Sequence, residues 1–299
     1  MDLLTELVAL QDKANGTISL SEMREGLGEE YSPLPAERPI LSCRRFSGYI
    51  DRQWQISSFS ALISGKPYHA ELGDRDPIIL DDRKSATEAT GEGEPSGIFS
   101  FPKGTKAGTF LHDVFEHLDF TQRDTSAMKK LVADKLKEYG FELKWQGTIC
   151  TMIQKVISAP LEKGKDDFTL SQIKNEDRLN ELEFYFPLKS ISPKKLKRLF
   201  AEHAGPELRT EFPERIERLE FAPVKGFMKG FIDMVFQFDD RFYIVDWKSN
   251  FLGSRVEDYG QDALTAVMEN DFYVLQYHIY SLALHQYLNA RLPGYDYEI

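Results

Sequence analysis

The chain has 299 residues, of which 41% are hydrophobic and 12% aromatic, which suits one large domain with a substantial core. Its formal net charge is −11, so either the substrate is not nucleic acid or another protein delivers the nucleic acid to the site. No apolar run approaches the roughly 18 residues of a transmembrane helix, and the first residues lack the features of a signal peptide. Cys43 and Cys150 follow neither a metal-binding nor a disulfide spacing. We therefore expect a cytoplasmic protein without a membrane segment.

The N-terminal third contains little core material. We expect residues 1–50 to form an arm or linker, with one helix predicted by the leucines at helical spacing from Leu3 to Leu10. Residues 53–60 alternate between apolar and polar side chains and predict a strand that leads into a short helix. Residues 65–107 are rich in Gly, Asp, Glu, Pro, Ser and Thr, so we expect most of them to form a mobile loop.

The rest of the chain predicts a mixture of helices and strands. One helix begins near Thr109, its expected N-cap, and carries His112 beside an apolar stripe. The other predicted segments are helices over 127–138, 146–158, 193–203 and 271–290, and a strand over 181–188 that ends at Pro187. This order predicts a mixed α/β domain with a small central sheet flanked by helices.

A β-hairpin is predicted after these segments. Residues 230–236 and 242–250 are rich in β-branched and aromatic side chains, which favours two strands. Asp239 and Asp240 between them are residues typical of a turn. If these two residues form the whole loop, the turn fixes which residues of the two strands face each other.

That register places two carboxylates directly opposite each other. Asp233 then faces Asp246, with Cβ atoms about 4.5–5.5 Å apart, and such a pair is destabilising unless a cation offsets it. Strand alternation puts Lys248 on the same side as Asp246. Two acids and a lysine around one point are suited to metal-assisted hydrolysis of a phosphodiester. An exposed hairpin with solvated charges is the alternative, but both aspartates interrupt apolar runs that otherwise predict core strands.

The spacing Asp233…Asp246-x-Lys248 resembles that of the PD-(D/E)xK nuclease superfamily, although the pattern alone is weak. Five segments resemble the nuclease domain of RecB, a subunit of exodeoxyribonuclease V (RecBCD): AGTFLHDVFE at 107–116, NELEFY at 180–185, GFMKGFID at 226–233, VDWKSN at 245–250 and LQYHIYSLALH at 275–285. They occur in the family's order. The resemblance implies a restriction-endonuclease-like core over residues 51–299. It also implies that residues 1–50 are a linker following an absent helicase part.

The resemblance also implies the roles of individual residues. The divalent metal would be bound by His112, Asp233, Asp246 and the backbone carbonyl of Trp247. Lys248 would orient or activate the attacking water and offset the charge of the phosphate.

Further roles fall on one strand and one helix. Glu181 matches the family's acidic-strand carboxylate better than Glu183 does, and strand alternation puts both on one face. Gln276 and Tyr280 are neighbours on one helix face, where the resemblance implies that they contact DNA or brace Lys248.

The implied activity is that of an exodeoxyribonuclease V type enzyme in double-strand-break repair and recombination. It would be a Mg²⁺-dependent nuclease that mainly cuts single-stranded DNA delivered by a helicase. The imidazole ligand makes Mn²⁺ an expected substitute, whereas Ca²⁺ is expected to bind without supporting cleavage. RecC-like and RecD-like subunits and the RecA recombinase are the implied partners. The alternatives are another PD-(D/E)xK nuclease, AddAB-like or Cas4-like, or a docking module for such partners.

Overall fold

The structure is a computed structural model that describes residues 3–21, 45–50, 54–65, 97–122, 124–203, 208 and 211–297. The chain falls into two units, Met1–Ile50 and Asp51–Ile299. Helix α1 (Leu3–Lys13) lies in the first unit, where the leucine spacing predicts a helix, and none of its residues is buried. That this unit serves as an arm or linker remains a prediction.

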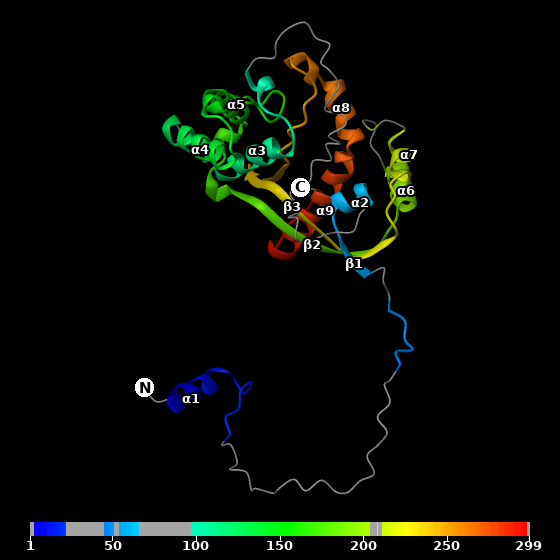
Figure 1. The fold of residues 1–299 in the computed structure, drawn as a ribbon. Helices are drawn as coiled ribbons and strands as arrows, with labels where there is room; N and C mark the ends of the chain where they lie inside the picture. Colours follow the sequence, from blue (N-terminus) through cyan, green and yellow to red (C-terminus); the bar gives the residue numbers. More distant parts are fainter. Residues whose placement is uncertain are drawn as a thin grey trace. The chain divides into compact units, whose positions relative to one another are not determined.

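The second unit is built around a mixed four-stranded sheet, as predicted (Figure 1). The strands are β1 (Trp54–Ser57), β2 (Arg178–Ile191), β3 (Val224–Phe238) and β4 (Arg241–Val245). β2 pairs antiparallel with one edge of β3 along most of its length. The other edge of β3 pairs first with β1, which is parallel and ends at Met228, and then with β4, which is antiparallel and begins at Met234. The central strand therefore changes its neighbour between these two residues.

The predicted hairpin joins β3 to β4. Asp239 and Asp240 have φ angles of 47° and 60°, the left-handed conformation that a tight two-residue hairpin turn needs at both positions. Phe236 pairs with Tyr243, which confirms the predicted register. The ladder continues to Val245, so Asp246 lies one residue beyond the end of β4.

The prediction that a strand ends at Pro187 is wrong. β2 runs through this proline to Ile191, and Pro187 itself pairs in register with Phe227. β2 lies at the edge of the sheet, where a residue without a backbone N–H is tolerated because that side of the strand needs no donor.

The helices pack in two groups, each with its own hydrophobic core. The first group is α3 (Thr105–His117), α4 (Thr125–Glu138) and α5 (Gln146–Ser158), and its core includes Met234 and Phe236. The second is α2 (Phe59–Ser64), α6 (Pro193–His203), α7 (Phe212–Glu217) and α9 (Tyr273–Arg291), with Met228 and Ile232. Figure 1 shows α3, α4 and α5 near one end of the long strands and α6 and α7 near the other. Asp233 therefore lies between Ile232, which belongs to the core of the second group, and Met234, which belongs to the core of the first.

Several helix boundaries differ from the predictions. α3 begins at Thr105, four residues earlier than expected, so Thr109 lies inside the helix and its hydroxyl donates to the carbonyl of Thr105. The predicted loop over 65–107 therefore extends too far, and its residues 66–96 lie outside the described part. Helices α7 and α8 (Gln261–Asn270) were not predicted. The 3₁₀ turns are Gly97–Ser100, Leu143–Trp145, Leu170–Gln172, Asn175–Asp177 and Val256–Tyr259. No helix in the described ranges is long and apolar enough to cross a membrane.

Candidate active site

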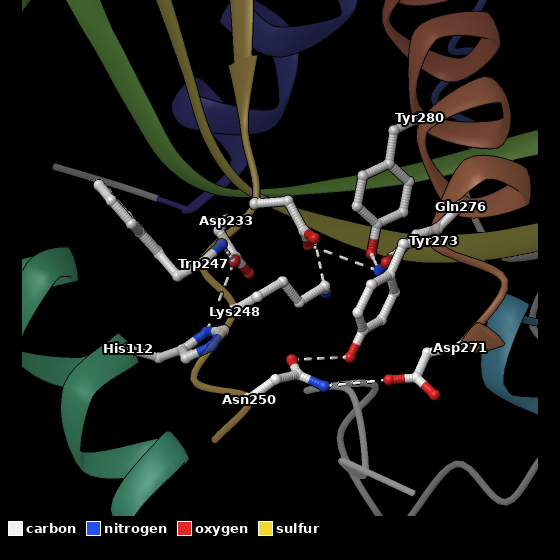
Figure 2. Close-up of polar contacts among 10 residues, drawn as sticks. His112, Asp233, Trp247, Lys248, Asn250, Asp271, Tyr273, Gln276 and Tyr280 are labelled. Atoms are coloured by element: carbon white, nitrogen blue, oxygen red, sulfur yellow. Dashed lines mark hydrogen bonds and ion pairs between the residues drawn. The ribbon is translucent and has the colours of Figure 1, made fainter. Parts of the chain in front are cut away.

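The candidate site lies where β3 changes its neighbour. Asp233 precedes the first β3 residue that pairs with β4, and the chain leaves β4 directly after Val245. The backbone N–H of Trp247 then donates to Asp233 Oδ2 at 2.6 Å (Figure 2). The Asp233 carboxylate thereby holds the segment after β4 beside the open edge of β3. This hydrogen bond joins two residues that are 14 positions apart in the sequence.

The second carboxylate of the pair faces a lysine. Asp246 Oδ2 lies 2.5 Å from Lys248 Nζ, so the two side chains form an ion pair. On α9, the Gln276 side-chain amide lies 3.5 Å from Asp246 Oδ1 and donates to the Tyr280 hydroxyl at 2.9 Å. Gln276 is 1% exposed and Tyr280 5% exposed. This burial leaves little of either side chain accessible to DNA, while their role as braces remains a prediction.

His112 approaches the site from α3. Its Nδ1 lies 3.5 Å from Asp233 Oδ2 (Figure 2). Burial lowers the pKa of His112, but the hydrogen bond and charge of Asp233 outweigh burial, so the net pKa is raised above its usual value. The Trp247 ring stacks on Phe115 of the same helix, with ring centroids 4.3 Å apart. α3 therefore contacts both the carboxylate and the segment that the carboxylate holds.

The acidic strand β2 supplies two candidate carboxylates. Asn180 pairs with Met234 and Leu182 with Ile232, so Glu181 occupies the register position opposite Asp233. Glu181 has a φ of 51°, an unusual conformation for a residue inside a strand. Glu183 lies 3.0 Å from Lys229 Nζ, and this contact lowers the pKa of Glu183. The register therefore favours Glu181 as the carboxylate nearest the site, while its role remains a prediction.

Tyr273, Asn250 and Asp271, which were not predicted as site residues, form a chain of contacts that begins at Lys248. The Tyr273 ring centroid lies 4.5 Å from Lys248 Nζ. The Tyr273 hydroxyl donates to Asn250 Oδ1 at 3.1 Å, and the Asn250 amide donates to Asp271 Oδ2 at 3.0 Å (Figure 2). Phe272, with a φ of 57°, directly precedes α9.

The spacing of Tyr273 and Asn250 from predicted site residues could have identified both from the sequence. Tyr273 lies three positions before Gln276, and residues at this spacing share a helix face. Asn250 follows Lys248 by two positions, which places both on one side of an extended segment.

The donor set suits a hard divalent cation, since it offers two carboxylates and an imidazole. Within the protein, Asp233 contacts His112 and the backbone N–H of Trp247, and Asp246 contacts Lys248. The Trp247 N–H beside Asp233 and the Lys248 ammonium beside Asp246 reduce the repulsion expected between the two carboxylates.

Within the described ranges, the one trio of ligand atoms lying within 4.8 Å of one another is Asp113, Glu116 and His117. Asp113 lies 2.7 Å from Lys135 Nζ, and this ammonium would have to move before a cation could bind. The ion pair between Asp113 and Lys135 ties α3 to α4.

The chain is similar to RecB subunits of RecBCD enzymes. It is 37% identical to that of Escherichia coli (strain K12) over 248 residues, which are 82% of this chain and 20% of the relative. It is 31% identical to that of Haemophilus influenzae over 265 residues, 84% of this chain and 21% of the relative. For Mycolicibacterium smegmatis the identity is 29% over 291 residues, 89% of this chain and 27% of the relative.

No family model matches the chain. The chain spans between about a fifth and a quarter of the length of these relatives. The similarity nevertheless covers more than four fifths of its own residues in each case. The chain is therefore a RecB-like region.

Proposed function

We propose that this chain is a metal-dependent DNA nuclease of the RecBCD type with a PD-(D/E)xK core. The observation that carries the proposal is the convergence of His112, Asp233, Asp246 and Lys248 where β3 changes its neighbour. The substrate is mainly single-stranded DNA delivered by a helicase during double-strand-break repair and recombination. RecC-like and RecD-like subunits and RecA are its proposed partners, with residues 1–50 as the linker from a helicase part. The cytoplasm is its proposed compartment.

The residues that would hold Mg²⁺ are His112, Asp233, Asp246 and the backbone carbonyl of Trp247. When bound, the ion supplies a Lewis acid that polarises the scissile phosphate and lowers the pKa of water. Mn²⁺ suits the same donors because one of them is an imidazole, whereas the longer bonds and looser geometry of Ca²⁺ leave the reacting groups misplaced.

The remaining side chains orient the reaction. Lys248 is placed to orient the attacking water and to offset the negative charge of the phosphate. Its partner Asp246 and the ring of Tyr273 fix the ammonium on two sides. Hydrolysis adds the water oxygen to phosphorus, breaks the bond to the leaving sugar oxygen and returns a proton to that oxygen. Glu181 is the proposed additional carboxylate because of its register position opposite Asp233.

The test is cleavage of labelled single-stranded and duplex DNA by the purified chain in Mg²⁺, Ca²⁺ and EDTA. We expect cleavage of the single strand in Mg²⁺ and none in Ca²⁺ or EDTA. Asp246→Asn preserves the shape of the side chain but removes its charge, so we expect cleavage to fall at least about 100-fold. Wild-type rates in this variant, or robust digestion in EDTA, would refute the assignment of the metal site, whereas no cleavage under any condition would favour a docking module.

A second variant separates the two roles of the site. Lys248→Gln removes the ammonium without removing a proposed metal ligand. We expect it to lose cleavage and to retain Mn²⁺ binding in isothermal titration calorimetry. Loss of Mn²⁺ binding in Lys248→Gln would contradict this division of roles.

A further inference from the structure

One face of β1, β2 and β3 carries a row of apolar side chains that are exposed or half-buried. We call this surface the aromatic face; its apolar members are Trp54, Ile56, Tyr185, Pro187, Phe227 and Phe231. Trp54 is 59% exposed and Tyr185 51% exposed. The alternate residues of the same strands, such as Phe184 and Met228, are buried in the core. An exposed apolar surface of this kind marks an interaction site.

The rings of the aromatic face are combined with a lysine. Trp54 and Phe227 meet edge to face, with centroids 5.4 Å apart. Lys229 Nζ lies 5.1 Å from the ring centroid of Tyr185 and 5.3 Å from that of Phe231. Proteins that bind single-stranded DNA use exposed aromatic rings on which the bases stack, and cations that contact the phosphates or the rings.

The charge of the aromatic face differs from that of the whole chain. Strand alternation places Lys189, Lys225 and Lys229 on it, against Glu183, which pairs with Lys229 at 3.0 Å. Cations thus outnumber anions on the part of the face away from Asp233, although the chain as a whole has a net charge of −11. The face therefore attracts phosphate locally where the rest of the molecule repels it.

The aromatic face leads to the candidate active site. Asp233 follows Phe231 by two positions on β3, so alternation continues the same face to this carboxylate. From Lys225 to Asp233 the strand rises roughly 26 Å. The site and the stacking surface are therefore parts of one continuous strip.

We propose that the aromatic face binds single-stranded DNA by base stacking and guides the strand to Asp233 and Asp246. This proposal rests on the proposed nuclease function, because it assigns the path of that enzyme's substrate. A duplex keeps its bases stacked inside and offers no base to the rings. A protein partner could cover the same rings, but the lysine among the rings and the continuity with the site favour a nucleic acid.

The first experiment measures binding without cleavage. Fluorescence anisotropy with fluorescein-labelled dT₂₀ in EDTA compares the wild-type chain with Trp54→Ala, Tyr185→Ala and Trp54→Phe. We expect each alanine variant to lose about tenfold in affinity, Trp54→Phe to retain most of it, and duplex DNA to bind more weakly than dT₂₀. The control is Tyr277→Ala, an equally exposed ring on α9 outside the aromatic face, which should leave the affinity unchanged.

The second experiment separates this proposal from the nuclease assignment. The alanine variants should raise KM for an oligonucleotide while leaving hydrolysis of the small phosphodiester bis(p-nitrophenyl) phosphate unchanged. If no substrate is cleaved, the nuclease proposal fails, but the anisotropy in EDTA still tests the face. Unchanged dT₂₀ affinity in Trp54→Ala and Tyr185→Ala, with the fold retained by circular dichroism, would overturn the proposal and leave the face as a protein contact.

Discussion

At the scale of single residues, the site balances its own charges. Each carboxylate has a nearby cationic or N–H partner: His112 and the Trp247 N–H for Asp233, and Lys248 for Asp246. These contacts reduce the repulsion between the two neighbouring carboxylates. Lys248 in turn lies between a carboxylate and the ring of Tyr273, which fix the position of its ammonium.

Tyr273 is a positioning residue whose effect should appear in kcat. Tyr273→Leu removes the ring that faces Lys248, and we expect kcat to fall about tenfold, the size of a partly desolvated cation–π contact. KM and Mn²⁺ affinity should stay unchanged because Tyr273 is no proposed ligand. Tyr273→Phe keeps the ring and loses only the hydrogen bond to Asn250, so it should retain most of kcat. Equal losses in both variants would show that the ring is not what positions Lys248.

Metal binding should depend on pH through His112. Its pKa is raised above 6.5, so in the metal-free protein the protonated imidazole adds stability that is complete below 6.5 and is lost as the pH rises through the higher folded-state pKa. A metal ligand must be neutral, so proton and metal compete. We therefore expect Mn²⁺ affinity, measured by calorimetry, to rise from pH 6 to pH 8. His112→Asn should bind more weakly and lack this rise; an equally steep rise in the variant would assign the titration to another group.

At the scale of elements, the change of neighbour along β3 creates the site. β1 occupies the edge of β3 up to Met228 and β4 occupies it from Met234, which leaves the intervening stretch beside the segment of Asp246 and Lys248. β1 approaches β3 most closely at Gly226, which pairs with Gln55 and has a φ of 128°. A Cβ there would lie 2.2 Å from the Gln55 carbonyl oxygen, so only glycine fits.

Gly226→Ala should therefore lower the free energy of unfolding by about 3 kcal/mol, through steric overlap and a strained backbone. The measurement is urea unfolding followed by circular dichroism. Gly260→Ala is the matched control, because its φ is −63° and the nearest atom to a new Cβ is the Glu257 carbonyl oxygen at 3.5 Å. The control should change stability by less than about 0.5 kcal/mol. Similar values for the two variants would contradict the close approach of β1.

At the scale of the whole molecule, the net charge of −11 opposes binding of a polyanion. The lysines of the aromatic face reduce this repulsion over one strip of the sheet and leave the rest of the surface acidic. In a larger enzyme, a helicase part would supply the strand at high effective concentration, so tight intrinsic binding is unnecessary.

We expect the isolated chain to bind single-stranded DNA with a Kd at or beyond the weak end of about 10⁻⁴–10⁻⁶ M at physiological salt. With three lysines on the face, the logarithm of affinity should fall with the logarithm of salt with a slope of about −2. Fusion to a basic single-strand-binding module should raise cleavage of oligonucleotides and leave bis(p-nitrophenyl) phosphate hydrolysis unchanged. Nanomolar binding by the isolated chain in an anisotropy titration would contradict the need for delivery.

Local patterns in the sequence predicted much of the fold. The turn residues Asp239 and Asp240 fixed the hairpin register, because a two-residue loop leaves one alignment of the strands. The helix predicted over 193–203 has the same bounds as α6. Pro187 was misread because the sequence does not indicate that β2 is an edge strand. The start of α3 was missed because its first turn carries no side-chain cap.

The sequence by itself determined the residue types of the candidate site, their spacing, and the hairpin register that follows from one short turn. Only the tertiary structure decided which residues surround Lys248. Tyr273 and Gln276 reach the site from α9, and His112 reaches it from α3. These contacts join segments more than 20 residues apart and depend on how two helix groups pack against one sheet. Short-range periodicity carries no information about such packing, whereas turn and strand geometry follow from neighbouring residues.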